Sequence, residues 1–245
     1  MPNLYGFFIS IGILLSILSA QKLVKKGDEE ILWGLSPWII IPGIIGARIY
    51  HVIDLFDYYS RSPIEIMKVW NGGLGIWGGL IGGFIGATIY LKVKGKDVLT
   101  WLDIVAAVTP LAQAVGRWGN FFNTEIFGKP TSLPWGLYVQ PQLRPDGYST
   151  FERFHPLFLY ESVLNLILFI TLFKMYKKYS ERIPHGVFTA LYLGGYSIIR
   201  YFLEFLRINP WQIRIDPYLF LNVSQCISIL VVSFSIVFIK LKVKK

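Results

Sequence analysis

The residues with the clearest capacity for chemistry lie at 116–128, GRWGNFFNTEIFG, directly after a long apolar segment. Arg117, Asn120 and Glu125 occur there among glycines and aromatic side chains. A guanidinium presents a planar fork of donors that fits a phosphate or carboxylate, and glycine lets the backbone approach a ligand closely. The stretch therefore suggests a site for an anionic group. The alternative is a packed turn at a membrane surface, with the arginine and the glutamate as a structural ion pair.

A second group of polar residues lies further along the chain. Tyr196, Arg200, Glu204 and Arg207 follow one another at spacings of four, four and three residues. At about 100° per residue this spacing places all of them on one face of a helix. Ionisable side chains are costly in hydrocarbon and normally face a partner, a cavity or a substrate path. The stripe thus indicates a functional site, and the alternative is an Arg-Glu-Arg ladder that only joins helices.

A third set of polar residues opens the apolar segment that starts at Pro156. Glu161 lies one turn inside this segment and must find a partner there. His155 could accept a proton near neutral pH, or it could be a hydrogen-bonding cap at the membrane boundary. The sequence shows no His/Cys/Asp cluster at metal-ligand spacing and no phosphate-binding P-loop, so we expect neither a metal nor a cofactor. These residues predict a cationic, cofactor-free pocket, for which a phospholipid head group is the obvious occupant.

The composition shows which elements must position these residues. Of the 245 residues 53% are hydrophobic and 16% are charged, against roughly 25% charged in soluble domains. This predicts an all-α, polytopic membrane protein. The net charge of +9 could suggest nucleic acid, but the lysines cluster at the ends of apolar segments and are typical of topology signals. The one cysteine, Cys226, lies in an apolar run and is expected to be buried filler.

Membrane-spanning helices need about 20 apolar residues each. Seven segments are predicted: 4–20, 31–53, 69–91, 98–115, 156–173, 186–206 and 218–239. The first has no positive charge before it and lysines after it, so we expect an uncleaved anchor with the N-terminus outside. Seven crossings then place the C-terminus in the cytoplasm. The positive-inside rule supports this orientation, because most basic residues fall in the predicted inner loops: Lys22, Lys25, Lys26, Lys92, Lys94, Lys96, Lys174, Lys177, Lys178, Arg182, Lys240, Lys242, Lys244 and Lys245.

Outside the membrane we expect little structure. The hydrophilic loop 129–155 carries several prolines and is too short for a domain, so it predicts a small outer head with a hairpin near 135–139 and a turn at 144–147. The chain 1–245 is therefore expected to be a single transmembrane domain. Glycines recur through the third segment, which favours close helix packing over the wall of a groove for an acyl chain.

Taken together, these motifs resemble the bacterial prolipoprotein diacylglyceryl transferase family. The resemblance rests mainly on the long run 116–128 and extends over nearly the whole chain. It also includes the residues Tyr5-Gly6, Gly46-Ala47-Arg48, the glycines of the third segment, His155-Pro156, Tyr160-Glu161, the stripe from Tyr196 to Arg207, and Ser224-Gln225.

The resemblance implies a multi-pass enzyme of the bacterial plasma or inner membrane. Such an enzyme transfers the diacylglyceryl group of phosphatidylglycerol to the lipobox cysteine of a prolipoprotein signal peptide, with no cofactor and no nucleic acid. By motif, Arg117 would hold the phosphate and Arg200 would be the main catalytic cation. The remaining implied site residues are Asn120, Glu125 and Gly128 around the head group, Glu204 and Arg207 beside Arg200, Tyr5 and Tyr196 as hydrogen-bonding groups, and His155.

One position departs from the family pattern. Many relatives have a histidine, often proposed as the base, where this chain has Trp77. Trp cannot accept a proton, so the base lies elsewhere or nearby arginines favour the thiolate and no dedicated base is needed. The main rival function is an anionic phospholipid transporter or scramblase, but such folds usually contain internal repeats or paired broken helices, and the sequence shows neither. The intramembrane stripe argues against a receptor-like scaffold, the second rival.

Overall fold

The computed structural model describes residues 4–123, 126–216 and 219–244. The described chain is mostly helical, and it divides into two compact units, Met1–Leu23 with Leu102–Lys245 and Val24–Trp101. Five described helices are long and apolar enough to cross a membrane: α2 (Glu29–Asp54), α4 (Ile76–Val93), α5 (Val98–Phe122), α6 (Leu157–Tyr179) and α8 (Val223–Val243). Two further long helices are α1 (Leu4–Ala20) and α7 (Val187–Glu204). The chain is a multi-pass helical membrane protein.

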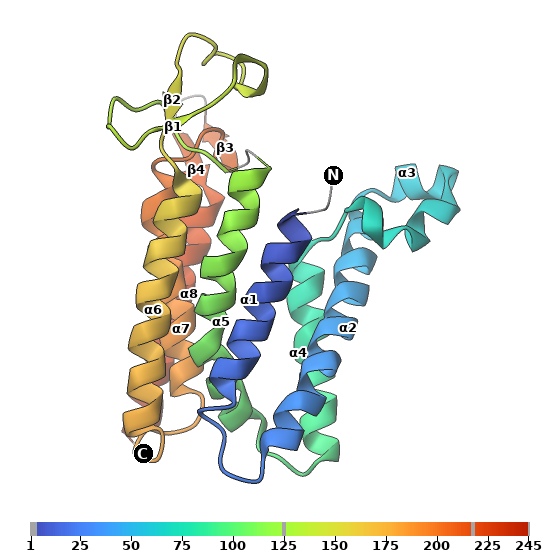
Figure 1. The fold of residues 1–245 in the computed structure, drawn as a ribbon, viewed down its shortest axis with the longest axis vertical. Helices are drawn as coiled ribbons and strands as arrows, with labels where there is room; N and C mark the ends of the chain where they lie inside the picture. Colours follow the sequence, from blue (N-terminus) through green and yellow to red (C-terminus); the bar gives the residue numbers. More distant parts are fainter. Residues whose placement is uncertain (1–3, 124–125, 217–218, 245) are drawn as a thin grey trace. The chain divides into compact units, whose positions relative to one another are not determined.

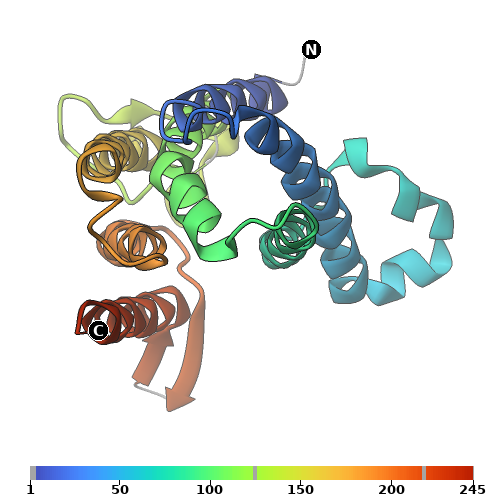
Figure 2. The same ribbon diagram turned by 90° about the horizontal axis from the view of Figure 1, so that it is seen from below.

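In the larger unit, α7 packs against α6 on one side and against α8 on the other (Figure 2). Helix α1 lies against α5, where Gly12 faces the backbone of Ala112 and the Ser16 hydroxyl donates to the Val108 carbonyl at 3.1 Å. The small residue lets the two helices approach closely, as is common between membrane helices. This unit contains both stretches that the sequence singles out for chemistry.

A buried carboxylate fastens α5 to the start of α7. Asp103 accepts the backbone N–H groups of Gly186 and Thr189 and the Thr189 hydroxyl, each at 2.7 Å. These bonds satisfy N–H groups that a helix start leaves without an intrahelical partner. Since Asp103 lies near the start of α5, the two helices run in the same direction, and α6 returns between them along the chain.

The head lies where α5 ends and α6 begins (Figure 1). Strand β1 (Leu137–Tyr138) pairs antiparallel with β2 (Arg153–Phe154), and the 3₁₀ helix η3 (Pro141–Leu143) follows β1. The predicted turn at 144–147 is present, with Gly147 at φ 81°. A second antiparallel pair, β3 (Gln212–Asp216) and β4 (Leu219–Asn222), precedes α8.

The smaller unit is built on the packing of α2 against α4. A Cβ on Gly78 would overlap the Gly46 carbonyl oxygen, and a Cβ on Gly82 would overlap that of Pro42. The glycines of α4 therefore bring the two backbones together, which confirms the helix-packing interpretation over a groove wall. Between these helices run α3 (Phe56–Arg61) and the 3₁₀ helices η1 (Pro63–Met67) and η2 (Val69–Asn71).

The segment after α3 is held by the buried guanidinium of Arg48. Its Nε donates to the Ile66 carbonyl at 2.9 Å, and its Nη1 donates to the carbonyls of Gly72 at 2.7 Å and Gly73 at 3.0 Å. Its Nη2 donates to the Glu65 carbonyl. One side chain thus satisfies several carbonyls of an irregular segment, as backbone near a membrane requires.

Four predicted boundaries were wrong. The fifth segment continues to Tyr179 rather than 173. The third segment begins at Ile76 rather than 69, because Gly72 and Gly73 have φ of 86° and 73°, which an α-helix excludes. The last helix begins at Val223 rather than 218, after β4, and the Asn222 side chain caps it by accepting the Gln225 N–H at 3.2 Å. The fourth segment continues to Phe122 rather than 115, so most of the stretch 116–128 is helical instead of a turn.

Candidate functional site

Three helices of the larger unit bring ionised groups together around Glu161. This α6 residue is 1% exposed and uses both carboxylate oxygens. Arg117 of α5 approaches Oε1 through Nη2 at 2.6 Å, and Arg200 of α7 approaches Oε2 through Nη1 at 3.7 Å. The two arginines that the sequence selected from separate segments therefore meet on one buried carboxylate.

The stripe predicted on α7 continues the cluster. The Tyr196 hydroxyl donates to Glu161 Oε1 at 3.1 Å. Glu204 binds Arg200 through Oε2 at 2.9 Å, and Arg207 approaches the same oxygen at 3.8 Å. All four residues of the stripe thus belong to one ionic network, as their spacing predicts. The ladder of the alternative interpretation exists, but it also includes α5 and α6.

The burial of the charges makes the cluster cationic toward its surroundings. The side chains of Glu161 and Glu204 are 1% and 0% exposed, whereas those of Arg117, Arg200 and Arg207 are 22%, 23% and 45% exposed. Among the described residues of the cluster, three guanidinium groups stand against two carboxylates, so one positive charge is in excess. A partly dry site strengthens such fields. The arrangement can receive a singly charged anion with bidentate donors.

The remaining residues of the predicted signature lie beside Arg117. Asn120 is buried and its Oδ1 accepts from Arg117 Nη1 at 3.3 Å. Gly119 faces Tyr5 of α1 so closely that a Cβ there would touch the tyrosine backbone and ring. Tyr5 therefore lies next to the signature helix. Glu125 falls outside the described residues.

Gly128 connects the head to the end of α7. Its N–H donates to the His155 carbonyl at 2.8 Å, and it forms an isolated bridge with Arg207. A Cβ on Gly128 would lie 2.6 Å from the Leu206 carbonyl oxygen, so only glycine fits. The structure thus places Gly128 at the Arg207 end of the cluster.

His155 is hydrogen-bonded within the head. Its Nδ1 lies 3.1 Å from the Tyr160 hydroxyl, which accepts from Trp135 Nε1 at 2.9 Å. The Tyr160 hydroxyl therefore joins His155 and Trp135 in one hydrogen-bonded group. These hydrogen bonds favour the cap over the base. Trp77, at the start of α4, belongs to the other unit.

Sequence reasoning gave Glu161 no role in the site beyond its need for a partner. The sequence did contain a sign of this role, because Glu161 is an acidic residue one turn into an apolar helix. Arg117 is likewise a basic residue near the end of another apolar helix, and the two charges are opposite. The sequence does not give the rotation of α6, which decides which residue it faces. Among the described residues no group of three or more His, Cys, Asp or Glu side chains could hold a metal ion.

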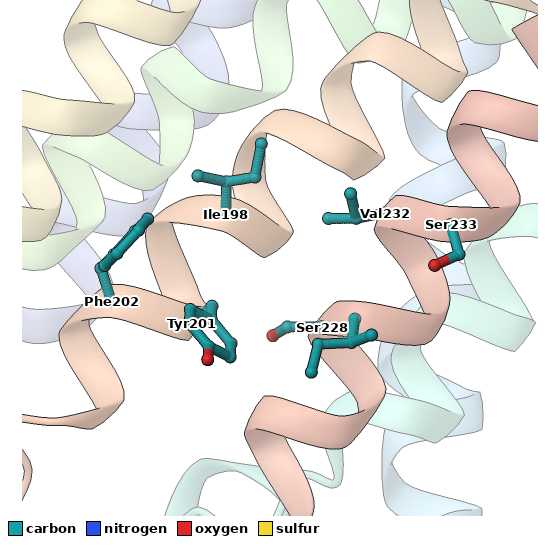
Figure 3. A pocket seen from close by; sticks show the side chains of 7 residues that line it. Ile198, Tyr201, Phe202, Ser228, Val232 and Ser233 are labelled. Carbon is teal, nitrogen blue, oxygen red and sulfur yellow. The ribbon is translucent and has the colours of Figure 1, made fainter.

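A hollow of about 200 Å³ lies away from the cluster, between α7 and α8 (Figure 3). Its walls are almost entirely apolar and contain no charged side chain: Ile198, Tyr201, Phe202, Ser228, Ile229, Val232 and Ser233. It lacks the cationic donors that an anionic head group needs. The ionic cluster, rather than this hollow, is the candidate site.

The chain is similar to known proteins over nearly its whole length. The model of the family described as prolipoprotein diacylglyceryl transferase matches residues 3–241. The chain is 42% identical over 213 residues to a phosphatidylglycerol–prolipoprotein diacylglyceryl transferase of Fervidobacterium nodosum, covering 84% of this chain and 70% of that protein. It is 41% identical over 219 residues to the protein of that name from Thermotoga maritima, covering 85% and 72%. It is 39% identical over 230 residues to the protein of that name from Trichormus variabilis, covering 92% of this chain and 80% of that protein.

Proposed function

Because the chain belongs to the prolipoprotein diacylglyceryl transferase family, we propose that it transfers the diacylglyceryl group of phosphatidylglycerol to the lipobox cysteine of a prolipoprotein signal peptide. The products are a thioether and glycerol phosphate, and the reaction is the first step of lipoprotein maturation. The observation that carries the proposal is the pair Arg117 and Arg200, held on Glu161 with their guanidinium edges partly exposed.

The chemistry fits a cluster of fixed cations. The cysteine thiol loses its proton to water. The thiolate then attacks the carbon of the diacylglyceryl group that is bonded to a phosphate oxygen. The C–S bond forms as the C–O bond breaks, and the electron pair remains on the departing phosphate oxygen. Preorganised guanidinium groups stabilise that oxygen as its charge develops. The same cations lower the pKa of a nearby thiol from its usual value of about 8.5, so no dedicated base is needed.

Individual residues take roles that follow from their contacts. Arg117 binds the phosphate, and Arg200 stabilises the leaving oxygen. Glu161 and Glu204 orient these guanidiniums from the buried side, and the Tyr196 hydroxyl fixes Glu161. The more exposed Arg207 receives the released glycerol phosphate. By the family motif, Asn120, Gly128, Tyr5 and His155 contribute to the head-group site, and so does Glu125, which is outside the described residues.

The lysine distribution supports an orientation in the bacterial plasma or inner membrane. The seven long helices α1, α2, α4, α5, α6, α7 and α8 cross the bilayer, with the N-terminus outside and the C-terminus in the cytoplasm. The whole chain acts as one enzyme domain, and the head 129–155 lies on the outer side. The charged stripe near the end of α7 then lies in the outer half of the bilayer.

A transfer assay with purified protein tests the proposal. With phosphatidylglycerol vesicles and a lipobox peptide, mass spectrometry should detect the thioether product. Arg117→Lys and Arg200→Lys should each lose about 100-fold or more in kcat/KM, because a point charge cannot replace a planar fork and each donor to a developing oxyanion is worth that much.

Arg182→Lys is the matched control, since Arg182 is exposed in the connection between α6 and α7. It should remain near wild type. Near-normal transfer by both site variants would contradict the roles of these arginines. Movement of phospholipid between leaflets with no thioether product would instead indicate a transporter or scramblase.

A further inference from the structure

A second row of polar side chains lies one helical turn below the ionic cluster. Arg117, Glu161 and Tyr196 each have a polar residue four positions away on the same helix face: Gln113, Asn165 and Tyr192. Helices α5 and α7 run in one direction and α6 in the other. A shift of four residues back along α5 or α7 therefore covers the same distance, in the same direction, as a shift of four residues forward along α6. In each case the side chain lies about 6 Å further from the outer end of the helices.

Contacts between the helices confirm that the second row is aligned. The Ser162 hydroxyl donates to the Ala114 carbonyl at 2.8 Å, which joins α6 to α5 at this level. The side chains of Gln113 and Tyr192 lie next to each other. The ring of Tyr192 stacks on that of Tyr196 with centroids 6.2 Å apart. Gln113 and Asn165 thus occupy, one turn lower, the helix positions that correspond to Arg117 and Glu161.

Three buried amide atoms of this row have no hydrogen-bond partner among the described residues. Asn165 is 0% exposed, and within the described parts of the chain neither its Oδ1 nor its Nδ2 has a hydrogen-bond partner. The Oε1 atom of Gln113 is likewise buried without a partner there. A buried polar atom without a partner is destabilising, and most such atoms in native proteins bind something. Two facing helices supply these atoms at one level, so the row can bind a ligand between them.

The atoms define the chemistry of that ligand. Two carbonyl oxygens need a donor, and the amide nitrogen needs an acceptor. A phosphodiester or an ester carbonyl only accepts, whereas a hydroxyl group both donates and accepts. We propose that Gln113 and Asn165 form a hydroxyl-binding subsite directly below the phosphate site. The hydroxyl belongs to the glycerol head group of the phospholipid or to an ordered water, and this assignment rests on the proposed transferase function.

The first test is Asn165→Leu, which keeps the volume and removes both polar atoms. The variant should lose about tenfold in kcat/KM, the worth of one good hydrogen bond. Its Tm in detergent should stay equal or rise, because an unsatisfied group has been removed. Ser235→Ala is the matched control: Ser235 Oγ is also buried without a partner in the described structure, but it faces Gly194 on the α8 side of α7. It should leave transfer unchanged.

Two substrates distinguish the sources of the hydroxyl. Phosphatidylethanol has the same acyl chains and phosphodiester but no head-group hydroxyl. If the subsite binds the lipid hydroxyl, wild type should prefer phosphatidylglycerol about tenfold, and Asn165→Leu should abolish the preference. If it binds water, the variant should slow both substrates equally. Either result supports the subsite.

Unchanged transfer by Asn165→Leu, or a Tm several degrees lower, would overturn the subsite, since the amide would then be idle or structural. Gln113→Met provides the same test should the first variant not fold, and its transfer should also fall. Wild-type protein that forms no thioether would count against the proposed function itself. A transferring wild type with an equally active variant would count against the subsite alone.

Discussion

The two oxygens of Glu161 hold arginines from different helices, and this geometry sets the separation of the guanidinium groups. Arg117 lies at 2.6 Å from one oxygen and Arg200 at 3.7 Å from the other. A phosphodiester also presents two oxygens with a negative charge between them. The carboxylate on the buried side therefore preorganises the cations for a phosphate on the open side, before any substrate arrives.

Replacing this carboxylate by an amide should harm both stability and transfer. Glu161→Gln keeps the shape but leaves Arg117 without its buried counter-charge and Arg200 with Glu204 as its remaining buried partner. We expect a loss of about 3 kcal/mol in the free energy of unfolding, typical of removing one partner of a buried ion pair. Transfer should fall by about 100-fold. Denaturation in detergent and the thioether assay measure the two effects.

Asp28→Asn is the control for this change. Asp28 pairs with Lys96 at 2.6 Å, but both side chains are about one third exposed. Solvent screens such a pair, so its loss should cost less than about 1 kcal/mol and leave transfer intact. Equal effects of the two substitutions would show that Glu161 is an ordinary ion-pair partner.

At the scale of residues, the sequence predicted the arginines better than their partners. The α7 stripe follows from spacing alone, because all its members belong to one helix. The contacts of Glu161 depend on the rotation of α6 against α5 and α7, which no local pattern encodes. No local pattern encodes the contacts of Asp103 either, since its partners Gly186 and Thr189 are more than eighty residues away in the sequence.

At the scale of elements, the two wrong helix starts share one cause. Hydrophobicity predicts which residues avoid water, but it does not separate helix from other apolar structure. Residues 69–75 and 218–222 are apolar enough to extend a span. The carbonyls of Gly72 and Gly73 instead bind Arg48, and β4 pairs with β3. In both places hydrogen bonds to distant groups replace the helical ones.

The α2 and α4 interface allows a sharp test, because neighbouring glycines differ in what they face. A Cβ on Gly78 would overlap the Gly46 carbonyl, whereas a Cβ on Gly79 would lie 3.6 Å from its nearest neighbours. Gly78→Ala should therefore destabilise by about 1–3 kcal/mol through overpacking. Gly79→Ala should be neutral or stabilising, since alanine is the better helix former. Thermal unfolding in detergent measures both, and equal Tm values would contradict the close packing.

At the scale of the whole molecule, charge type follows location. The lysines lie mostly in the predicted inner loops, while Arg117, Arg200 and Arg207 lie in or beside helices near the head. A lysine can set orientation as a hydrated point charge, whereas a guanidinium keeps its charge and its fork when partly buried. This division indicates that lysines set the orientation of the chain in the membrane, whereas arginines form the proposed site.

Cysteine labelling in whole cells tests the resulting orientation. In a Cys226→Ser background, Ser149→Cys in the head should react with a membrane-impermeant maleimide because that loop faces outward. Glu181→Cys, in the exposed connection between α6 and α7, should react only after the cells are opened. The two positions are separated by the single crossing of α6, so they must lie on opposite sides if that helix spans the bilayer. Labelling of Glu181→Cys but not of Ser149→Cys in intact cells would reverse the orientation and place the arginine cluster in the inner leaflet, away from exported prolipoproteins.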